Sequence, residues 1–186
     1  MFRRFSPGAR EVVIRAGDLA AAAGRDRIGT EFVLLALCED AALAPTLERH
    51  GVIGPAAQHA IAAALSRPRP YSDRELLATL GIDLDEVRRR MRALGEDEPF
   101  EVRRSVLWPL RVAVVGPGRD LPFTGGGRKV LEVASWRARR RGRTPVEPAD
   151  LLHGLLADGR SNAIRVLRHL RVDVRGLVSS LDRRAA

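Results

Sequence analysis

Several residue types are scarce in this chain of 186 residues, and each shortage excludes a class of structure. Its single cysteine, Cys38, rules out a disulfide within the chain and falls in an apolar run typical of a buried core position. Aromatic residues make up only 4%, so a core drawn from the 45% of apolar residues is mostly leucine, valine, isoleucine and alanine. No apolar run reaches the roughly 18 residues that read as a membrane-spanning helix.

Lysine is scarcer still, because Lys129 is the one lysine among 32 basic residues. The formal net charge is +9, but such an arginine bias suits a GC-rich genome as well as a functional surface. The net charge therefore bears on solubility and non-specific association rather than on fold. After the segment 1–5 (MFRRF) the chain turns polar, and it lacks the apolar core of a secretory signal. The sequence therefore predicts a cytoplasmic protein without membrane contact.

Motifs for catalysis are also missing. The histidines His50, His59, His153 and His169 show no metal-binding spacing with cysteine or carboxylate partners. No serine lies in a nucleophile elbow. The glycine-rich segment 125–129 (GGGRK) lacks the spacing of a phosphate-binding P-loop. We therefore expect no enzyme activity, no bound metal and no cofactor.

What the chain does contain is an internal repeat. The segment 5–13 (FSPGAREVV) returns as 123–131 (FTGGGRKVL), and 28–34 (IGTEFVL) falls on 146–152 (VEPADLL) in the same register. After a slip of two residues, 47–52 (LERHGV) falls on 167–172 (LRHLRV). Duplication of a helical unit is the signature of a repeat architecture, and it creates a seam between the copies where binding is expected.

Each copy predicts four short helices, from apolar spacing and from capping residues. In the first copy they run from Ser6-Pro7 to Gly24, from a Thr30 cap through the following apolar run, over 45–50 and over 55–65. In the second they run over 128–141, over 148–156, from a cap at Ser161 or Asn162, and from Asp173 to about Leu181.

The sequence therefore predicts an all-α fold in which two pseudo-symmetric four-helix repeats, 1–65 and 121–186, pack together. Between them lies a long, partly helical insert, 66–120, which begins with a proline-rich linker. Within the insert, 73–80 and 83–94 are predicted to be helices. The apolar, β-branched segment 106–115 is predicted to be a strand or an extended segment.

Two motifs carry a family resemblance. The opening phenylalanine, the serine cap and the helix of 5–13, followed by IGTEFVLLAL at 28–37, resemble the double Clp repeat in the N-terminal domain of ClpA- and ClpC-type chaperone ATPases. The second copy matches at 122–124 (PFT) and 128–132 (RKVLE), but Ala149 replaces the signature glutamate and His153 interrupts the leucine run. The resemblance covers about 1–65 and 121–182, and the long insert resembles linkers of stand-alone actinobacterial members.

The resemblance implies a non-catalytic module that binds peptides or proteins in the Clp proteolytic system, as an adaptor, a regulator or a decoy. Its implied partners are a Clp ATPase or the substrates of one. A phosphoarginine-type site would use Ser6 and Glu31, because a helix N-terminus attracts phosphate and a carboxylate holds a guanidinium. The second such site would use Thr124, but Ala149 there removes the carboxylate.

The same resemblance implies a peptide-binding seam, a docking place for cyclic peptide antibiotics. The seam positions are Phe2, Arg10, Phe123, Arg128 and Glu132.

Each of these assignments has a plainer alternative. Ser6, Thr30 and Thr124 are also ordinary helix caps, Glu31 is also a first-turn partner of the helix dipole, and Phe123 is also a core residue.

Another class of function rests on the basic run Arg137, Arg139, Arg140, Arg141 and Arg143 beside Trp136. Clustered arginines beside an aromatic ring suit nucleic acid, so a basic nucleic-acid-associated regulator is the alternative function. The plainer interpretation of this run is a solvated helix face.

Overall fold

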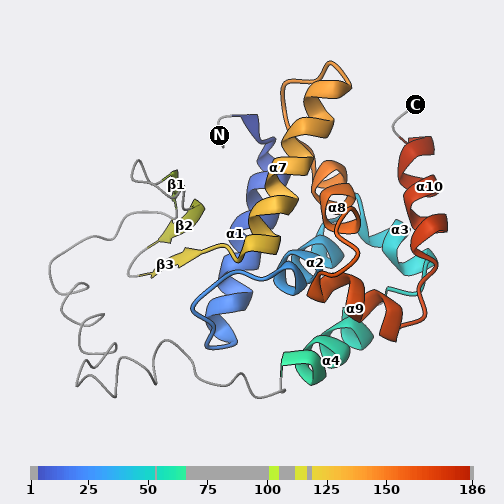
Figure 1. The fold of residues 1–186 in the computed structure, drawn as a ribbon, viewed down its shortest axis with the longest axis horizontal. Coiled ribbons are helices and arrows are strands. Elements are labelled where there is room, and N and C mark those ends of the chain that lie inside the picture. Colours follow the sequence, from blue (N-terminus) through green and yellow to red (C-terminus); the bar gives the residue numbers. More distant parts are fainter. Residues whose placement is uncertain (1–3, 53, 66–100, 105–111, 117–118, 185–186) are drawn as a thin grey trace, which may run out of the picture.

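The computed structural model describes residues 4–52, 54–65, 101–104, 112–116 and 119–184, and its fold is the expected pair of helical repeats (Figure 1). The first repeat consists of α1 (Pro7–Ala22), α2 (Thr30–Glu39), α3 (Ala44–Arg49) and α4 (Gly54–Leu65). The second consists of α7 (Gly125–Arg140), α8 (Pro148–Leu156), α9 (Asn162–His169) and α10 (Val174–Arg184).

Side-chain caps set where the first helix of each repeat begins. The Ser6 hydroxyl accepts a hydrogen bond from the Ala9 amide at 3.2 Å, and Thr124 Oγ1 accepts one from the Gly127 amide at 3.1 Å. These caps occupy equivalent places in the two copies, as expected. Because Thr124 caps directly into the three glycines, α7 starts at Gly125 rather than at the predicted residue 128.

The start of α2 differs from the prediction in a way that matters for the site. Its N-cap is Gly29, and Thr30 is already helical. A Cβ atom at position 29 would collide with the carboxyl group of Glu31, which folds back over the helix start. A side chain at position 29 would therefore displace the Glu31 carboxyl group from this place.

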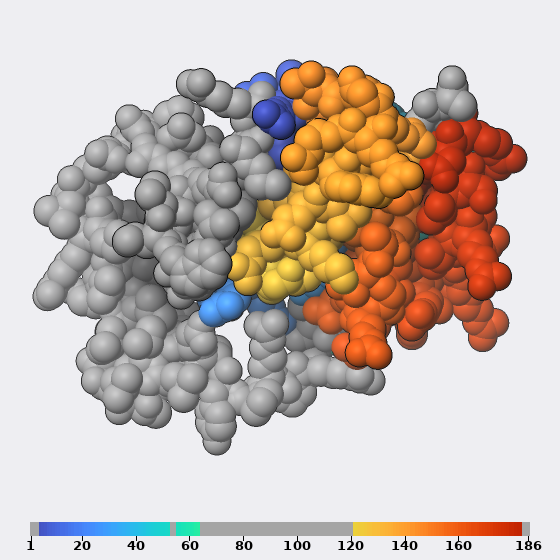
Figure 2. Space-filling view, turned by 45° about the horizontal axis from the view of Figure 1, so that its top comes forward, coloured from blue at the N-terminus to red at the C-terminus, as the bar shows by residue number. Residues whose placement is uncertain are grey.

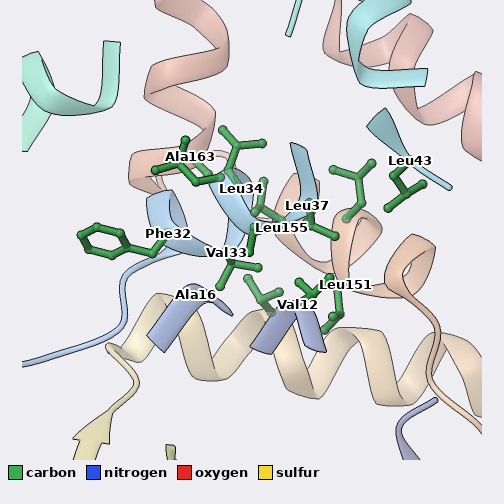
Figure 3. Close-up of a cluster of buried hydrophobic side chains, with 14 of the residues drawn as sticks. Val12, Ala16, Phe32, Val33, Leu34, Leu37, Leu43, Leu151, Leu155 and Ala163 are labelled. Atoms are coloured by element: carbon green, nitrogen blue, oxygen red, sulfur yellow. The ribbon is translucent and has the colours of Figure 1, made fainter. Parts of the chain in front are cut away.

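The core lies around α2 and α8. These two helices contact each other, and each also contacts both α1 and α7. Figure 3 shows Val12 of α1, Val33 and Leu37 of α2, and Leu151 and Leu155 of α8 meeting in one apolar cluster. Burial of aliphatic side chains from both copies in one cluster makes the two repeats a single packing unit.

A small antiparallel sheet precedes the second repeat, beside α1 and α7 in Figure 1. It consists of β1 (Glu101–Arg104), β2 (Val112–Gly116) and β3 (Arg119–Pro122), in the order β1-β2-β3. Strand β2 falls at the end of the predicted extended segment, whereas β1 and β3 were not predicted. The predicted helices over 73–80 and 83–94 lie outside the described residues.

Equivalent helix ends show the repeat in the backbone. Gly24 and Gly142 end α1 and α7 with φ of 67° and 68°. Gly51 ends α3 with φ of 80°, but the equivalent residue after α9 is Arg171, at φ of 56°. The same pair of amide-to-carbonyl bonds closes both of these turns, including Val52 to Leu47 and Val172 to Leu167, each at 2.9 Å. The second copy thus keeps the left-handed turn without the glycine that suits it.

Replacing Arg171 with glycine is expected to raise the free energy of unfolding by about 0.5–1 kcal/mol. Glycine removes the strain of a side chain in the left-handed backbone, and this gain exceeds the loss that comes from a more flexible unfolded chain. Urea denaturation followed by circular dichroism measures the change. Arg165→Gly, at an exposed position inside α9, is the control, and it should lower the stability by a similar amount. Destabilisation by Arg171→Gly would contradict the account.

Candidate peptide-binding site

The seam between the repeats is built by a reciprocal exchange of backbone. The Phe5 segment of the first copy pairs with Val146 of the second, and the Phe123 segment of the second copy pairs with Ile28 of the first. The Ser6 amide donates to the Val146 carbonyl at 2.9 Å, and the Thr124 amide donates to the Ile28 carbonyl at 3.0 Å. Each copy therefore completes the other at equivalent positions.

This exchange sets helix starts against each other crosswise. A Cβ atom on Gly8 of α1 would lie 3.5 Å from Pro148 of α8, and one on Gly126 of α7 would lie 3.3 Å from Thr30 of α2. The α1 start thus faces the α8 start of the other copy, and the α7 start faces the α2 start.

The crosswise arrangement corrects the expected pairing of Ser6 with Glu31. Ser6 bonds to the strand-like segment before α8, the helix that carries Ala149. Thr124 bonds to the segment before α2, the helix that carries Glu31. From the sequence, each cap is assigned to the motif-bearing helix of its own copy, because no local pattern indicates that the copies exchange backbone segments.

Glu31 lies deep in this arrangement, with only 4% of its surface exposed. Its Oε2 accepts a hydrogen bond from Asn162 Nδ2 of α9 at 3.1 Å. Next to it, Thr30 Oγ1 accepts from the Ala163 amide at 3.2 Å, so Thr30 caps α9 rather than α2. The starts of α2, α7 and α9 thus meet near Thr30, and the Glu31 carboxylate lies where the positive ends of helix dipoles converge.

The residues expected at the peptide-binding seam are in different settings. Phe123 is 3% exposed and belongs to the core, which agrees with the plainer of its two alternatives. Arg10 and Glu132 are exposed and Arg128 is half-buried. Phe2 lies outside the described residues. The burial of Phe123 follows from its place in the backbone exchange, where its ring packs against Gly127.

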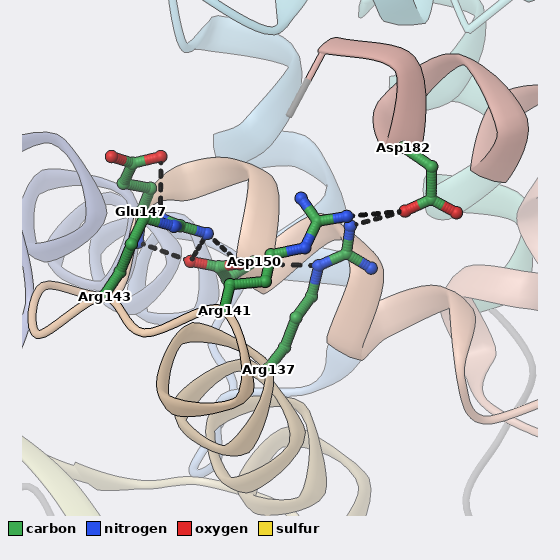
Figure 4. Close-up of polar contacts among 6 residues, drawn as sticks. All are labelled: Arg137, Arg141, Arg143, Glu147, Asp150 and Asp182. Atoms are coloured by element: carbon green, nitrogen blue, oxygen red, sulfur yellow. Dashed lines mark hydrogen bonds and ion pairs between the residues drawn. The ribbon is translucent and has the colours of Figure 1, made fainter. Parts of the chain in front are cut away.

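Part of the basic run is paired with carboxylates of the chain (Figure 4), whereas Arg139 and Arg140 are exposed. Arg143 Nη2 donates to both carboxylate oxygens of Asp150, at 2.9 and 3.1 Å. Arg137 lies 3.5 Å from Asp150 through Nε, and its Nη2 donates to Asp182 of α10 at 2.7 Å. Arg141 donates to the same Asp182 oxygen at 3.1 Å. Three of the five arginines are thus bound to carboxylates, which removes them from the charge that nucleic acid would need.

Asp150 is the centre of this network, with 1% of its surface exposed. Besides its arginine partners it accepts from the Glu147 amide at 3.0 Å, which closes a capping box at the start of α8. A buried carboxylate with this many donors holds α7, α8 and the connection between them together.

The network was missed in the sequence, although the repeat contained a signal for it. At the equivalent positions the first copy has Leu19 and Phe32, whereas the second has Arg137 and Asp150. Phe32 is 2% exposed and Asp150 is 1% exposed, so a buried apolar site of one copy became a buried ionic site in the other. Two polar replacements at contacting positions of one repeat point to an ion pair.

Replacing Asp150 with alanine is expected to lower the free energy of unfolding by about 3 kcal/mol, because Arg137 and Arg143 would keep their charges without the carboxylate. Asp182→Ala is the matched control. The Asp182 side chain is 49% exposed, so water can solvate its partners and the loss should stay within about 1 kcal/mol. Urea denaturation of both variants measures the difference, and equal losses would contradict the central place of Asp150.

The histidines and acidic residues do not gather into a metal site in the described part of the chain. It contains no group of three or more histidine, cysteine or acidic residues placed to hold a metal ion. His50 Nε2 lies 2.9 Å from the hydroxyl of Ser180, which itself donates to the Gly176 carbonyl at 3.0 Å. This contact joins the end of α3 in one repeat to α10 in the other, which gives His50 a structural role between the repeats.

Cys38 is a poor nucleophile in the folded protein. Burial, with a smaller contribution from the negative charge of Glu39, raises the pKa of the Cys38 thiol to about 12. The reactive thiolate is therefore scarce at neutral pH.

We expect iodoacetamide to alkylate Cys38 at pH 8 at least tenfold more slowly in the native protein than in urea. Because the pKa of the thiol is raised in the folded protein, the unfolded chain loses this proton first as the pH rises above the ordinary pKa of cysteine. The contribution of Cys38 to the free energy of unfolding therefore falls as the pH rises through that range. Mass spectrometry of the single cysteine measures the rate. Equal rates in buffer and urea would show that the thiol is exposed and ordinary.

Among the helices in the described ranges, none combines the length and the apolar character needed to cross a membrane.

The fold defines a two-repeat helical domain, and sequence comparison assigns it to a family. A profile of the Clp repeat (R) N-terminal domain matches residues 71–170. The chain belongs to this family. It is 29% identical over 174 residues to the chloroplastic chaperone protein ClpC of Pisum sativum, and 28% identical over 175 residues to a ClpA homologue, the ATP-binding subunit of a Clp protease, from Porphyra purpurea. These alignments cover 93% and 94% of this chain but only 14% and 16% of the relatives.

Solved structures share the fold across nearly the whole chain. The N-terminal domain of the Clp-associated chaperone ClpD from Arabidopsis thaliana superposes with a TM-score of 0.67 at 19% identity, covering 99% of this chain and 96% of that one. The Hsp104 N-terminal domain from Candida albicans gives a TM-score of 0.60 at 12% identity, with 95% and 88% coverage. The expected all-α double repeat is thereby confirmed as a Clp N-domain fold.

Proposed function

We propose that this chain is a non-catalytic module that binds peptides or proteins for a Clp-type ATPase, as an adaptor, a regulator or a decoy. Its family and its fold support the class. The single observation that carries the proposal is the crosswise seam, in which the capped start of α7 faces the helix start that carries Glu31.

The proposed ligand at this seam is a phosphorylated arginine side chain. The first turn of α7 has amides without helical acceptors, which suit a phosphate. Gly125 is exposed, and a Cβ atom on it would meet nothing within 4 Å, so a ligand can approach this residue. The guanidinium would take the Glu31 carboxylate in exchange for the Asn162 amide.

One such site is expected, because the other crosswise pair has no carboxylate. There Ser6 faces α8, whose matching residue is Ala149. A cyclic peptide would bind at the neighbouring seam positions Phe2, Arg10, Arg128 and Glu132. Phe123 would support that surface from the core rather than contact the ligand.

Calorimetric titration with phosphoarginine tests this proposal. The wild-type chain should bind one equivalent, Glu31→Gln should abolish binding, and Thr124→Ala should weaken it several-fold. Ser6→Ala is the matched control, since it removes an equivalent cap at the pair without a carboxylate, and it should bind as the wild type does. Equal weakening by Ser6→Ala and Thr124→Ala would contradict the crosswise site.

A second titration, with a ClpC-directed cyclic peptide, separates the two surfaces. Phe2→Ala should abolish binding of the cyclic peptide and leave phosphoarginine binding intact. If neither ligand binds a folded wild-type chain, then the proposed seam function is wrong.

A further inference from the structure

The basic run of α7 is divided between two directions. Arg137, Arg141 and Arg143 are paired with carboxylates, namely the buried Asp150 and the exposed Asp182, as described above. Arg139 and Arg140 are exposed instead. Arg139 donates only to the Ser135 carbonyl of its own helix, at 3.3 Å, and neither guanidinium has a carboxylate partner among the described residues.

Trp136 lies on the same outward face, one helical turn before these two arginines. Its side chain is 52% exposed, and it is the large hydrophobic residue that the described part of the chain leaves in solvent. The Arg140 guanidinium lies 5.1 Å from the centre of its ring, in the range of a cation–π contact. Trp136, Arg139 and Arg140 form a mixed aromatic and cationic surface, called here the α7 patch.

The repeat shows that the fold does not require the α7 patch. The equivalent positions on α1 carry Asp18, Ala21 and Ala22, and α1 folds and packs in the same way. The second copy therefore has an exposed tryptophan and two outward arginines where the first has an acid and two alanines. Packing explains the arginines that face inward, but it does not explain these three residues.

We propose that the α7 patch binds an acidic peptide segment of a partner protein. Arginine pairs with carboxylates through charge-assisted hydrogen bonds, and the indole ring offers an apolar platform beside them. Tryptophan and arginine are also the residue types that contribute most to protein interfaces. One turn of helix separates ring and charges by about 5.4 Å, so an extended ligand, with about 3.4 Å per residue, would place an apolar side chain one or two positions from an acid.

Charge on this face favours a peptide over nucleic acid. Glu132 is exposed one turn before Trp136, so the cationic surface on this face is confined to the last turn of α7. Two outward arginines also fall short of the roughly 6–10 phosphate contacts of salt-sensitive DNA-binding proteins. A short acidic segment needs only the end of the helix.

The α7 patch is separate from the proposed phosphoarginine site. Thr124 and Trp136 lie at opposite ends of α7, roughly 18 Å apart by the rise of the helix. Figure 2 shows the yellow and orange α7 segment on the surface of the molecule. One helix would thus present two surfaces, and either can fail experimentally without the other.

Fluorescence anisotropy with a labelled peptide of sequence Gly-Asp-Leu-Glu-Asp-Leu-Gly tests the proposal on the full chain. The wild type should bind it saturably and should not bind the peptide in which lysines replace the acids. Binding should weaken at least tenfold in Arg139→Gln/Arg140→Gln and in Trp136→Ala. The control Arg165→Gln/Arg168→Gln removes the same charge from exposed positions of α9 and should bind as the wild type does.

Circular dichroism checks that each variant is folded before its affinity is read. Absence of saturable binding by the wild type, or equal weakening in the α9 control, would overturn the proposal. A labelled DNA duplex is the third probe. If it binds more tightly than the acidic peptide and loses affinity in the same α7 variants, the surface is a nucleic-acid site and the acidic-peptide proposal is wrong.

Discussion

The structure depends on the reciprocal backbone exchange at the seam. The residue that precedes each Ser or Thr cap pairs with a segment of the other copy, Phe5 with Val146 and Phe123 with Ile28. The first helix of either repeat therefore begins on a support that the other repeat supplies. Burial of both phenylalanines follows from this, as does the shared apolar cluster of α1, α2 and α8. The two short repeats thus make one core together.

The same exchange determines which helix starts lie side by side. It brings the start of α7 to the start of α2, and Thr30 then caps α9 across the seam. Three helix starts lie near one buried carboxylate, and the favourable dipole interaction helps to keep Glu31 there. The second repeat differs from the first at another buried position, where it has the ionic network of Asp150 in place of the apolar Phe32. The two repeats thus share one backbone arrangement, and the candidate sites lie where their side chains differ.

The helices and caps could be predicted because they depend on local sequence: Ser6, Thr124 and Ser161 cap the helices expected of them. What could not be predicted depends on partners from the other copy. Nothing near Glu31 in the sequence points to Asn162, and nothing near Thr30 shows that its hydroxyl serves another helix. The burial of Phe123 and the segment that Ser6 contacts could not be decided from the sequence for the same reason, because both depend on the exchange rather than on local pattern.

Native-state hydrogen exchange tests the reciprocal seam most directly, by following the amides of Ser6, Ile28, Thr124 and Val146. All four donate across the seam, at 2.6 to 3.0 Å. We predict that they exchange together, at the rate of global unfolding, because neither repeat can open its seam segment alone. Exchange of the Ser6 and Val146 amides well before those of Ile28 and Thr124, or the reverse, would show that the two halves of the seam open separately and would contradict the account.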